Sequence, residues 1–430
     1  MVDLVDIGQK LVKLVGQETK PAIGCTEPVA VAFAAAAAKK YLHEDVEKVD
    51  INVSLNIYKN GKSVTIPFTN ESGLDLAAAL GIISGNPDDG YYIFKNVNED
   101  VLDKAKAMLA KNVIKVRIAH DCEEVFVEVN MYGKKHFVHT ISGGGHTHIQ
   151  KVEVDGKVEY SGGDKKTSLL SCSILKDLTF KDLREIVEKT DLNDIRFLLD
   201  GVKMNKSAAE QGLKGEKGSG FGSAFLNFSR KCKVSSDPAF KARIYTAAAA
   251  DFRMGGGNSP IMTSGGSGNQ GIGVILPIAV VAHEVNASEE KFIRSLFFGH
   301  AVNLYIKSYT GKLSSLCGCS IASGIGASAA ITWMLGGNDE QIAGAIQNML
   351  ANTTGVICDG AKESCALKLS TSAEEAVISA YLACSDVIVP KSKGIISSSA
   401  EDTIKNLGIL CRKGLSNTDE VIVNDIISKN

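Results

Sequence analysis

Two cysteines in the segment ICDGAKESCALKL, residues 357–369, have a spacing that raises the question of metal binding. Cys358 and Cys365 are separated by six residues, which is too many for the C-x2-C pair of a zinc site. Their thiols can be buried small side chains, partners in a disulfide, or ligands to another metal. Iron–sulfur clusters accept thiolates at looser spacings than zinc does, so a cluster is one of the open interpretations.

A second pair of cysteines, Cys317 and Cys319, lies upstream in GKLSSLCGCSIASGIGASAA, residues 311–330. The Gly- and Ala-rich residues that follow this pair are typical of a closely packed helix. All four thiols are therefore expected near loops or helix ends of one helical region, where they can converge on a metal. Scattered free thiols, an iron–sulfur cluster and a zinc site all stay open on spacing alone.

A glycine-rich loop, RMGGGNSPIMTSGGSGNQGIG at residues 253–273, leads into an apolar helix that we expect to begin near Gly271. Backbone N–H groups at such a helix N-terminus bind anions, and the loop contains no acidic residue. It lacks the G-K-[ST] ending of a phosphate-binding loop. We therefore expect a substrate carboxylate as its ligand, with a flexible surface loop as the alternative. The candidate substrate-binding residues are Ser264, Gly268, Asn269 and Gln270.

Cys25 lies in the segment AIGCTEP, directly before a helix whose expected N-cap is Thr26. The dipole at a helix N-terminus favours a thiolate and lowers the pKa of a thiol. The position therefore suits a base, a nucleophile or a metal ligand, and a buried structural thiol is the alternative.

Several histidines occur in HFVHTISGGGHTHI, residues 136–149. Their density suggests a metal, but the remaining ligands of a zinc site are not evident in the sequence. We therefore expect them in a turn and on the face of a sheet.

The elements around these motifs predict an α+β fold. Residues 4–18 and the residues after Thr26 have helical patterns, whereas alternating and β-branched segments between residues 48 and 160 predict a mixed, mostly antiparallel sheet. The segments predicted to be strands include 48–59 and 63–68. From about residue 177 the pattern is all-helical and rich in Gly and Ala. The expected domains are a helical N-terminal segment packing on the catalytic domain (1–45), an α+β domain (46–175) and a helical catalytic domain (176–430).

The composition excludes several classes of function. The 430 residues have a formal net charge of −2, which favours neither nucleic acid nor an anionic membrane as a partner. The charged N-terminal residues differ from a signal peptide, and no stretch approaches 18 strongly apolar residues. We therefore expect a soluble cytoplasmic protein. Without an export signal, its ten cysteines are not expected to form a disulfide framework.

Four segments together resemble the L-cysteine desulfidase family: IGCTEPVAVAFAAA, TSGGSGNQGI, LSSLCGC…GIGASAA and CDGAKESCALKL. Members of this family are iron–sulfur enzymes that degrade cysteine, and they are related to the α-chain of bacterial iron–sulfur L-serine dehydratase. The likeness runs from about residue 7 to residue 400. The loop TSGGSGNQGIGVILPI is also similar to the substrate loop of the dehydratases.

The resemblance implies a [4Fe-4S] cluster held by Cys317, Cys358 and Cys365, with Cys319 as the rival of Cys317. Related dehydratases can close their cluster with a C-terminal cysteine, whereas this chain ends in NDIISKN. An open iron is therefore expected, which can bind the substrate as a Lewis acid.

The resemblance also implies roles for the segment around Cys25. Cys25 is the candidate catalytic base, and substrate binding is its alternative role. Thr26 and Glu27 are expected to contact the carboxylate and the ammonium group of the substrate.

We therefore expect a carbon–sulfur lyase, an L-cysteine desulfidase that converts L-cysteine to hydrogen sulfide, ammonia and pyruvate. No lysine has a clear pyridoxal-phosphate signature, so a cofactor other than PLP is expected. An iron–sulfur L-serine dehydratase is the main alternative, and a non-catalytic iron–sulfur sensor is a remote one. The apolar, small-residue helices are compatible with a homodimer.

Overall fold

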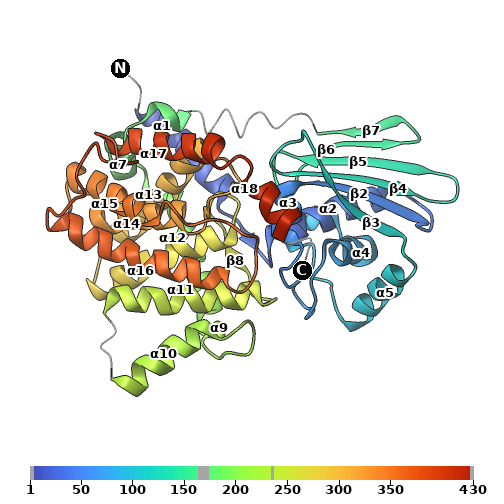
Figure 1. Ribbon diagram of the computed structural model, residues 1–430, viewed down its shortest axis with the longest axis horizontal. Coiled ribbons are helices and arrows are strands. Elements are labelled where there is room, and N and C mark those ends of the chain that lie inside the picture. The colour runs from blue at the N-terminus through green and yellow to red at the C-terminus, as the bar shows by residue number, and fades with distance from the viewer. Residues whose placement is uncertain (1–3, 163–173, 234–236, 427–430) are drawn as a thin grey trace.

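The computed structural model describes residues 4–162, 174–233 and 237–426, and it has an α+β fold with two halves (Figure 1). The sheet half comprises residues 26–162, and the helical half comprises residues 4–18 and 174–409. The predicted fold class, an N-terminal sheet region followed by a helical region, is confirmed. The predicted domain limits at residues 45 and 175 stay predictions.

The sheet half contains a six-stranded sheet with the order β3-β2-β4-β5-β6-β7. The β2–β3 pair is parallel and the other pairs are antiparallel, so the sheet is mixed and mostly antiparallel, as predicted. The strands are β2 (Lys48–Ser54), β3 (Ile114–Ala119), β4 (Phe126–Tyr132), β5 (Phe137–Gly143), β6 (Ile149–Val154) and β7 (Lys157–Ser161).

Helix α2 (Thr26–Tyr41) packs against the sheet and against α4 (Leu74–Ser84), and its alanines are buried. The small residues let the two helices approach closely: a Cβ atom added at Gly81 would lie 2.3 Å from the Ala32 carbonyl oxygen. The half is completed by α3 (Leu55–Gly61), η1 (Pro87–Tyr92) and α5 (Glu99–Ala110). This packing fixes the start of α2, where Cys25 is the N-cap residue, one position before the predicted cap.

Two predicted strands differ from the structure. The segment 48–59 is a strand only as far as Ser54, whose hydroxyl group caps α3 and so turns the chain into a helix. The segment 63–68 is a loop rather than a strand. It contains Pro67, which has no N–H group for a sheet ladder, and Phe68, whose φ of 63° is not a strand conformation.

The helical half is built around α12 and α14, which contact several neighbouring helices. Its helices are α1 (Leu4–Glu18), η2 (Ile174–Asp177), α7 (Phe180–Lys189), α8 (Leu192–Ile195), α9 (Leu198–Gly212), α10 (Phe221–Cys232), α11 (Pro238–Met254), α12 (Gly268–Glu284), α13 (Glu289–Thr310), α14 (Ile321–Met334), α15 (Asp339–Thr353), α16 (Cys365–Cys384) and α17 (Ala400–Ile409). Among the described residues, none of the helices has the length and apolar character that a membrane span requires.

Short segments from two parts of the chain join the two halves. Strand β1 (Pro21–Ala22), just before α2, pairs with β8 (Ile261–Met262) in the glycine-rich loop of the helical half. The chain then ends in η3 (Leu410–Gly414), α18 (Thr418–Glu420) and η4 (Val421–Ile426), and the last two contact α3 of the sheet half. The boundary between the halves is therefore a packed interface.

Candidate functional site

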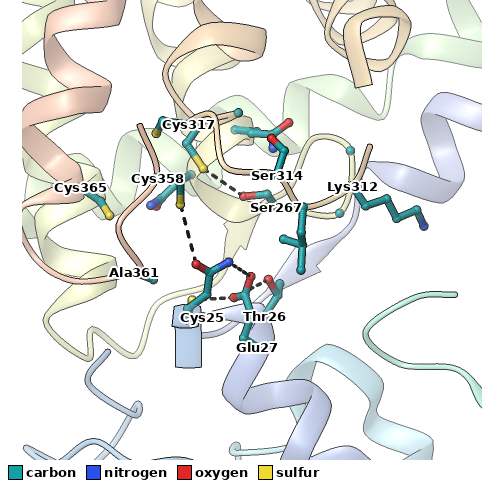
Figure 2. Close-up of a pocket in the computed structure, with 18 of the residues that line it drawn as sticks. Cys25, Thr26, Glu27, Ser267, Lys312, Ser314, Cys317, Cys358, Ala361 and Cys365 are labelled. Atoms are coloured by element: carbon teal, nitrogen blue, oxygen red, sulfur yellow. Dashed lines mark hydrogen bonds between the residues drawn. The ribbon is translucent and has the colours of Figure 1, made fainter. Parts of the chain in front are cut away.

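A cleft lies between the two halves, and side chains from both line it (Figure 2). The sheet wall, named here for the sheet half, consists of Cys25, Thr26, Glu27, Asn60 and His146. The helical wall includes Arg253, Gly265, Gly266, Ser267, Asn269, Gln270, Lys307, Lys312, Cys317, Cys319, Cys358 and Cys365. The cleft thus brings together the cysteine motifs, the glycine-rich loop and the start of α2.

The cysteines of the helical wall come from two loops that are hydrogen-bonded to each other. The backbone N–H of Cys317 donates to the Val356 carbonyl at 2.9 Å, and the N–H of Cys358 donates to the Ser315 carbonyl at 2.8 Å. Cys365 follows as the first residue of α16. Figure 2 shows Cys317, Cys358 and Cys365 on the same side of the cleft. Residues far apart in the sequence therefore share one wall.

The protonation of these thiols differs. Burial raises the pKa of Cys358, and it raises the pKa of Cys365 to about 12. A hydrogen bond to Cys319, together with burial, raises the pKa of Cys317. The same hydrogen bond, assisted by the Ser267 hydroxyl group, overcomes burial and lowers the pKa of Cys319 to about 7. Because metals bind thiolates, loading this wall with metal would release protons.

The donor set of the helical wall fits an iron–sulfur cluster in its chemistry. Within the described chain, no three His, Cys, Asp or Glu side chains lie close enough to hold one metal ion. A cluster makes a different demand, because each thiolate binds its own iron atom and the sulfur atoms need not converge on one point. Cys317, Cys358 and Cys365 supply such separated thiols, while Cys319 beside Cys317 leaves the choice between these two a prediction.

The glycine-rich loop presents the N-terminus of α12 to the cleft. The helix begins at Gly268, earlier than the predicted Gly271, so that Asn269 and Gln270 lie in its first turn. The first N–H groups of a helix have no partner within the helix and carry partial positive charge. The Ser267 hydroxyl group before them lies 3.6 Å from the sulfur of Cys319. An anion bound at this terminus would therefore lie beside the thiols.

Arg253 strengthens this anion site, and it was not among the predicted residues. Its side chain is buried, and its guanidinium donates to Asn269 Oδ1 at 2.9 Å and to the Gly24 carbonyl at 2.7 Å. Lys307 of α13 is also buried and donates to the Gly265 carbonyl at 2.6 Å. The signal for Arg253 was its position as the first residue of the glycine-rich motif.

Two predicted substrate-binding residues lie behind the cleft lining instead of within it. Ser264 is buried, and its hydroxyl group lies 2.8 Å from His300 Nδ1 and accepts from Asn303 Nδ2 at 2.9 Å. Gly268 packs against Arg253, because a Cβ atom at that position would lie 2.4 Å from Nε. Both residues therefore support the loop, whereas Asn269 and Gln270 line the cleft, and their role in substrate binding stays a prediction.

The sheet wall is organised around the buried carboxylate of Glu27. Its Oε2 accepts from the Cys25 thiol at 2.9 Å and from the Thr26 hydroxyl group at 3.2 Å, and its Oε1 accepts from Asn60 Nδ2 at 3.3 Å. Asn60 Oδ1 in turn accepts from the thiol of Cys358 at 3.8 Å. This chain of hydrogen bonds, visible in Figure 2, joins the acid of one wall to the Cys358 thiol of the other.

The prediction that the helix terminus holds Cys25 as a thiolate is wrong. Burial, and then the neighbouring charge of Glu27, raise the pKa of Cys25 well above its usual value. Burial opposes ionisation of Glu27 too, but His146, the Cys25 hydrogen bond and the charge of Arg253 together lower its pKa. The resting site therefore has a protonated thiol donating to a carboxylate.

His146 is a further group that sequence reasoning did not assign to the site. It lies in the turn between β5 and β6, and its Nε2 is 4.0 Å from Glu27 Oε1. Burial lowers the pKa of His146 to about 4, so its ring is neutral near pH 7. At that pH, the hydrogen bond from Cys25 and the charge of Arg253 stabilise the ionised form of Glu27.

Three buried polar atoms of the cleft have no hydrogen-bond partner among the described residues: His146 Nε2, Arg253 Nε and Gln270 Oε1. Buried polar atoms are rarely left unpaired in proteins. Since these donors and acceptors belong to residues that line the same cleft from both walls, they indicate a polar ligand there.

A family model described as "Serine dehydratase alpha chain" matches residues 94–424, which include the four cysteines of the helical wall and Arg253. The chain is also similar over nearly its whole length to proteins named "UPF0597 protein". The relative from Clostridium botulinum (strain Loch Maree / Type A3) is 55% identical over 420 residues, covering 97% of each chain. The relative from Clostridioides difficile (strain 630) is 41% identical, covering 95% of this chain and 96% of its own.

Proposed function

Since the chain belongs to the serine dehydratase alpha-chain family, we propose that it is an L-cysteine desulfidase with a [4Fe-4S] cluster. The reaction would convert L-cysteine to hydrogen sulfide, ammonia and pyruvate. The observation that carries the proposal is the shared cleft: three separated thiols face an anion-binding helix terminus and a buried acid–thiol pair. Thiols for a cluster, a site for a carboxylate and a proton acceptor are the groups that such a lyase needs.

Cys317, Cys358 and Cys365 are the proposed cluster ligands. When bound, the cluster would supply a Lewis-acidic iron that makes the thiolate at the substrate Cβ a better leaving group. Without the cluster, the raised pKa values of the three thiols favour their protonated form, and ligation would require their deprotonation.

The first turn of α12 and Arg253 would hold the substrate carboxylate. Arg253 Nε has no partner among the described residues and belongs to a guanidinium already oriented by Asn269 and Gly24. A charged donor held in place in this way binds a carboxylate without losing much side-chain entropy. The carboxylate would lie next to Ser267, and hence next to the thiols of the same wall.

Glu27 would bind the substrate ammonium group from the opposite wall. It is the buried acid of the cleft, and its lowered pKa keeps it ionised at neutral pH. Thr26, predicted to contact the carboxylate, donates its hydroxyl group to Glu27 and so helps to orient this acid. An amino acid would therefore span the cleft, with its anionic end on the helical wall and its cationic end on the sheet wall.

Cys25 is the proposed base for the Cα proton. Its thiol is protonated at rest, and the negative charge of Glu27, whose Oε2 accepts its hydrogen bond at 2.9 Å, contributes to its raised pKa. A substrate ammonium group bound at Glu27 would offset this charge and favour loss of the thiol proton to solvent, so that the thiolate would form only when the substrate is in place. The electrons of the broken Cα–H bond would form the Cα–Cβ double bond as the Cβ–S bond breaks, and aminoacrylate would then hydrolyse to pyruvate and ammonia.

An L-serine dehydratase is the second candidate, because the matching family model has that description. Both substrates have the same carboxylate and ammonium groups and differ only at the Cβ substituent, so the described cleft favours neither strongly.

The deciding experiment compares L-cysteine and L-serine with anaerobically purified, iron-loaded protein. We expect sulfide, pyruvate and ammonia in equal amounts from L-cysteine, with a higher kcat/KM than pyruvate formation from L-serine. Faster pyruvate formation from L-serine would establish the dehydratase instead. A fully active protein that contains no iron would overturn the cluster.

A further inference from the structure

A buried lysine connects the C-terminal residues to one of the proposed cluster ligands. Lys59 of α3 has no exposed side-chain surface, which is rare for lysine and requires a partner for its charge. Its Nζ donates to Asp419 Oδ1 at 2.6 Å and to the Cys358 carbonyl oxygen at 3.2 Å. Asp419 lies in α18, which Figure 1 shows beside α3 between the two halves.

The segment that supplies Asp419, residues 415–426, is here called the C-terminal strap. It is anchored by the buried side chains of Ile422 and Val423. Its first residue also touches the other cysteine loop, because the Ser315 hydroxyl group donates to the Leu415 carbonyl at 3.0 Å. The strap thus contacts the Cys317 loop directly and reaches the Cys358 loop through Lys59.

The Cys358 loop is held by α3 as well as by the Cys317 loop. Ile357 beside it is exposed, and the loop lies outside any helix, so that these contacts with distant residues set its position. Gly360 lies directly against α3, where a Cβ atom would be 2.6 Å from the Lys59 carbonyl oxygen. Asn60 accepts from the Cys358 thiol itself. The α3 helix therefore fixes the loop at its carbonyl, its sulfur and its backbone.

We propose that Asp419 and Lys59 are positioning residues for the cluster: Asp419 fixes Lys59, and Lys59 fixes the carbonyl of Cys358. The inference rests on the proposed function, because it needs a cluster at Cys358. A buried ion pair is weak evidence for stability, since apolar residues of similar volume often serve as well. Apolar residues could not make the hydrogen bond from Lys59 to the backbone carbonyl of Cys358. The charged pair would therefore serve to retain iron by fixing this proposed ligand.

The test measures the rate at which the anaerobic, iron-loaded protein loses iron to the chelator ferrozine. Substitution of groups that support metal ligands typically costs about 10–100-fold in metal affinity. We expect Asp419→Asn and Lys59→Met to release iron at least about 10-fold faster than the wild type. The control is Asp339→Asn, which breaks a partly buried ion pair with Arg184 inside the helical half and should release iron at the wild-type rate.

A double variant separates a role in cluster retention from a role in folding. Lys59→Met with Asp419→Leu replaces the buried pair with apolar side chains, which should preserve the melting temperature. We expect this folded variant to lose iron as fast as Lys59→Met, and Asp419→Glu to restore slow release. Release at the wild-type rate from both Asp419→Asn and the double variant would overturn the inference. A wild-type protein that binds no iron would instead overturn the proposed function.

Discussion

The two walls of the cleft differ in the chemistry they contribute. The helical wall carries four thiols, two buried cationic side chains and a helix N-terminus, whereas the sheet wall carries one buried carboxylate with the groups that donate to it. The helical wall is therefore equipped to bind metal and an anion, and the sheet wall to bind a cation and move a proton. Reaction would require both, which places the chemistry at the boundary between the two halves.

The walls also differ in how their positions are secured. On the helical wall, the glycine-rich loop is held by polar side chains of α13, including His300, Asn303 and Lys307. On the sheet wall, Glu27 is held by its immediate neighbours Cys25 and Thr26. Substitutions on the two walls should therefore have separable effects on iron content, substrate binding and turnover.

The largest effect is expected for the cluster ligands of the helical wall. Cys365→Ala should remove the iron-dependent absorbance near 400 nm together with activity, because the cluster would lose one of three thiolates. Helix α16 provides a matched control, since Cys365 begins it and Cys384 ends it. Cys384→Ala should retain both iron and turnover. Iron bound to Cys365→Ala at the wild-type level would remove this residue from the ligand set.

The same measurement decides between two neighbouring thiols. We expect Cys317→Ala to lose iron and Cys319→Ala to retain it. Loss of iron only in Cys319→Ala would reverse the assignment.

The next largest effect is expected on the sheet wall. Cys25→Ala and Glu27→Gln should retain iron but lower kcat by roughly 10²–10⁴-fold, the range typical for removal of a general base. Iron content and single-turnover pyruvate formation would be measured together. Unchanged turnover in Cys25→Ala would exclude its role as the base, and simultaneous loss of iron would contradict the separation of the two walls.

A smaller effect is expected for the proposed carboxylate site. Arg253→Gln should raise KM for L-cysteine by about 10–100-fold, which corresponds to the loss of a hydrogen bond to a charged group. Its control lies on the same helix, α11, where Arg243 pairs with Glu374 outside the cleft lining. Arg243→Gln should leave KM unchanged. An Arg253→Gln protein with normal KM would move the carboxylate to another part of the cleft.

The smallest effect concerns stability against pH and contrasts one histidine of each half. Burial lowers the pKa of His300 to about 3, so below pH 6.5 the unfolded chain binds a proton that the folded protein does not. This group should therefore cost stability as the pH falls from 6.5, by at most about 1.4 kcal/mol per pH unit. His300→Gln should flatten the fall in urea-unfolding free energy between pH 6.5 and 4.5.

His136 on the sheet half should show the opposite sign. A hydrogen bond to Asp155 raises the pKa of His136. The stabilisation of the folded protein by this group is therefore present at low pH and is lost as the pH rises through the raised pKa. His136→Gln should therefore lower stability more at pH 5 than at pH 8. Parallel pH curves for wild type and both variants would contradict these protonation states.

Much of the fold and part of the site could be predicted from the sequence. Alternation and helical periodicity identified the sheet and the helical half, because burial on one face leaves a direct pattern in the residues. The relationship to the serine dehydratase alpha chain followed from the cysteine and glycine motifs, and the family model confirms it. Two segments were mispredicted as strands because local features override their β-propensity. These features are the helix cap at Ser54 and the positive φ at Phe68.

The contributions of distant residues were harder to predict. Arg253 is the first residue of the glycine-rich motif, but its role depends on the approach of Gly24, which lies 229 residues earlier in the sequence, just before α2. His146 and Lys59 reach the site through the packing of the two halves, which no local spacing encodes. The protonation of Cys25 was mispredicted because the helix terminus was weighed without the burial and the carboxylate that oppose it.

The central claim is that one cleft holds the substrate thiol at the cluster while the opposite wall removes a proton. Iron-loaded, anaerobic Cys25→Ala protein tests it most directly, because this variant should bind L-cysteine without turning it over. We predict that L-cysteine changes the visible absorption and the Mössbauer spectrum of the bound iron, whereas L-alanine, which lacks the thiol, does not. Spectra that stay the same at saturating L-cysteine would contradict the account.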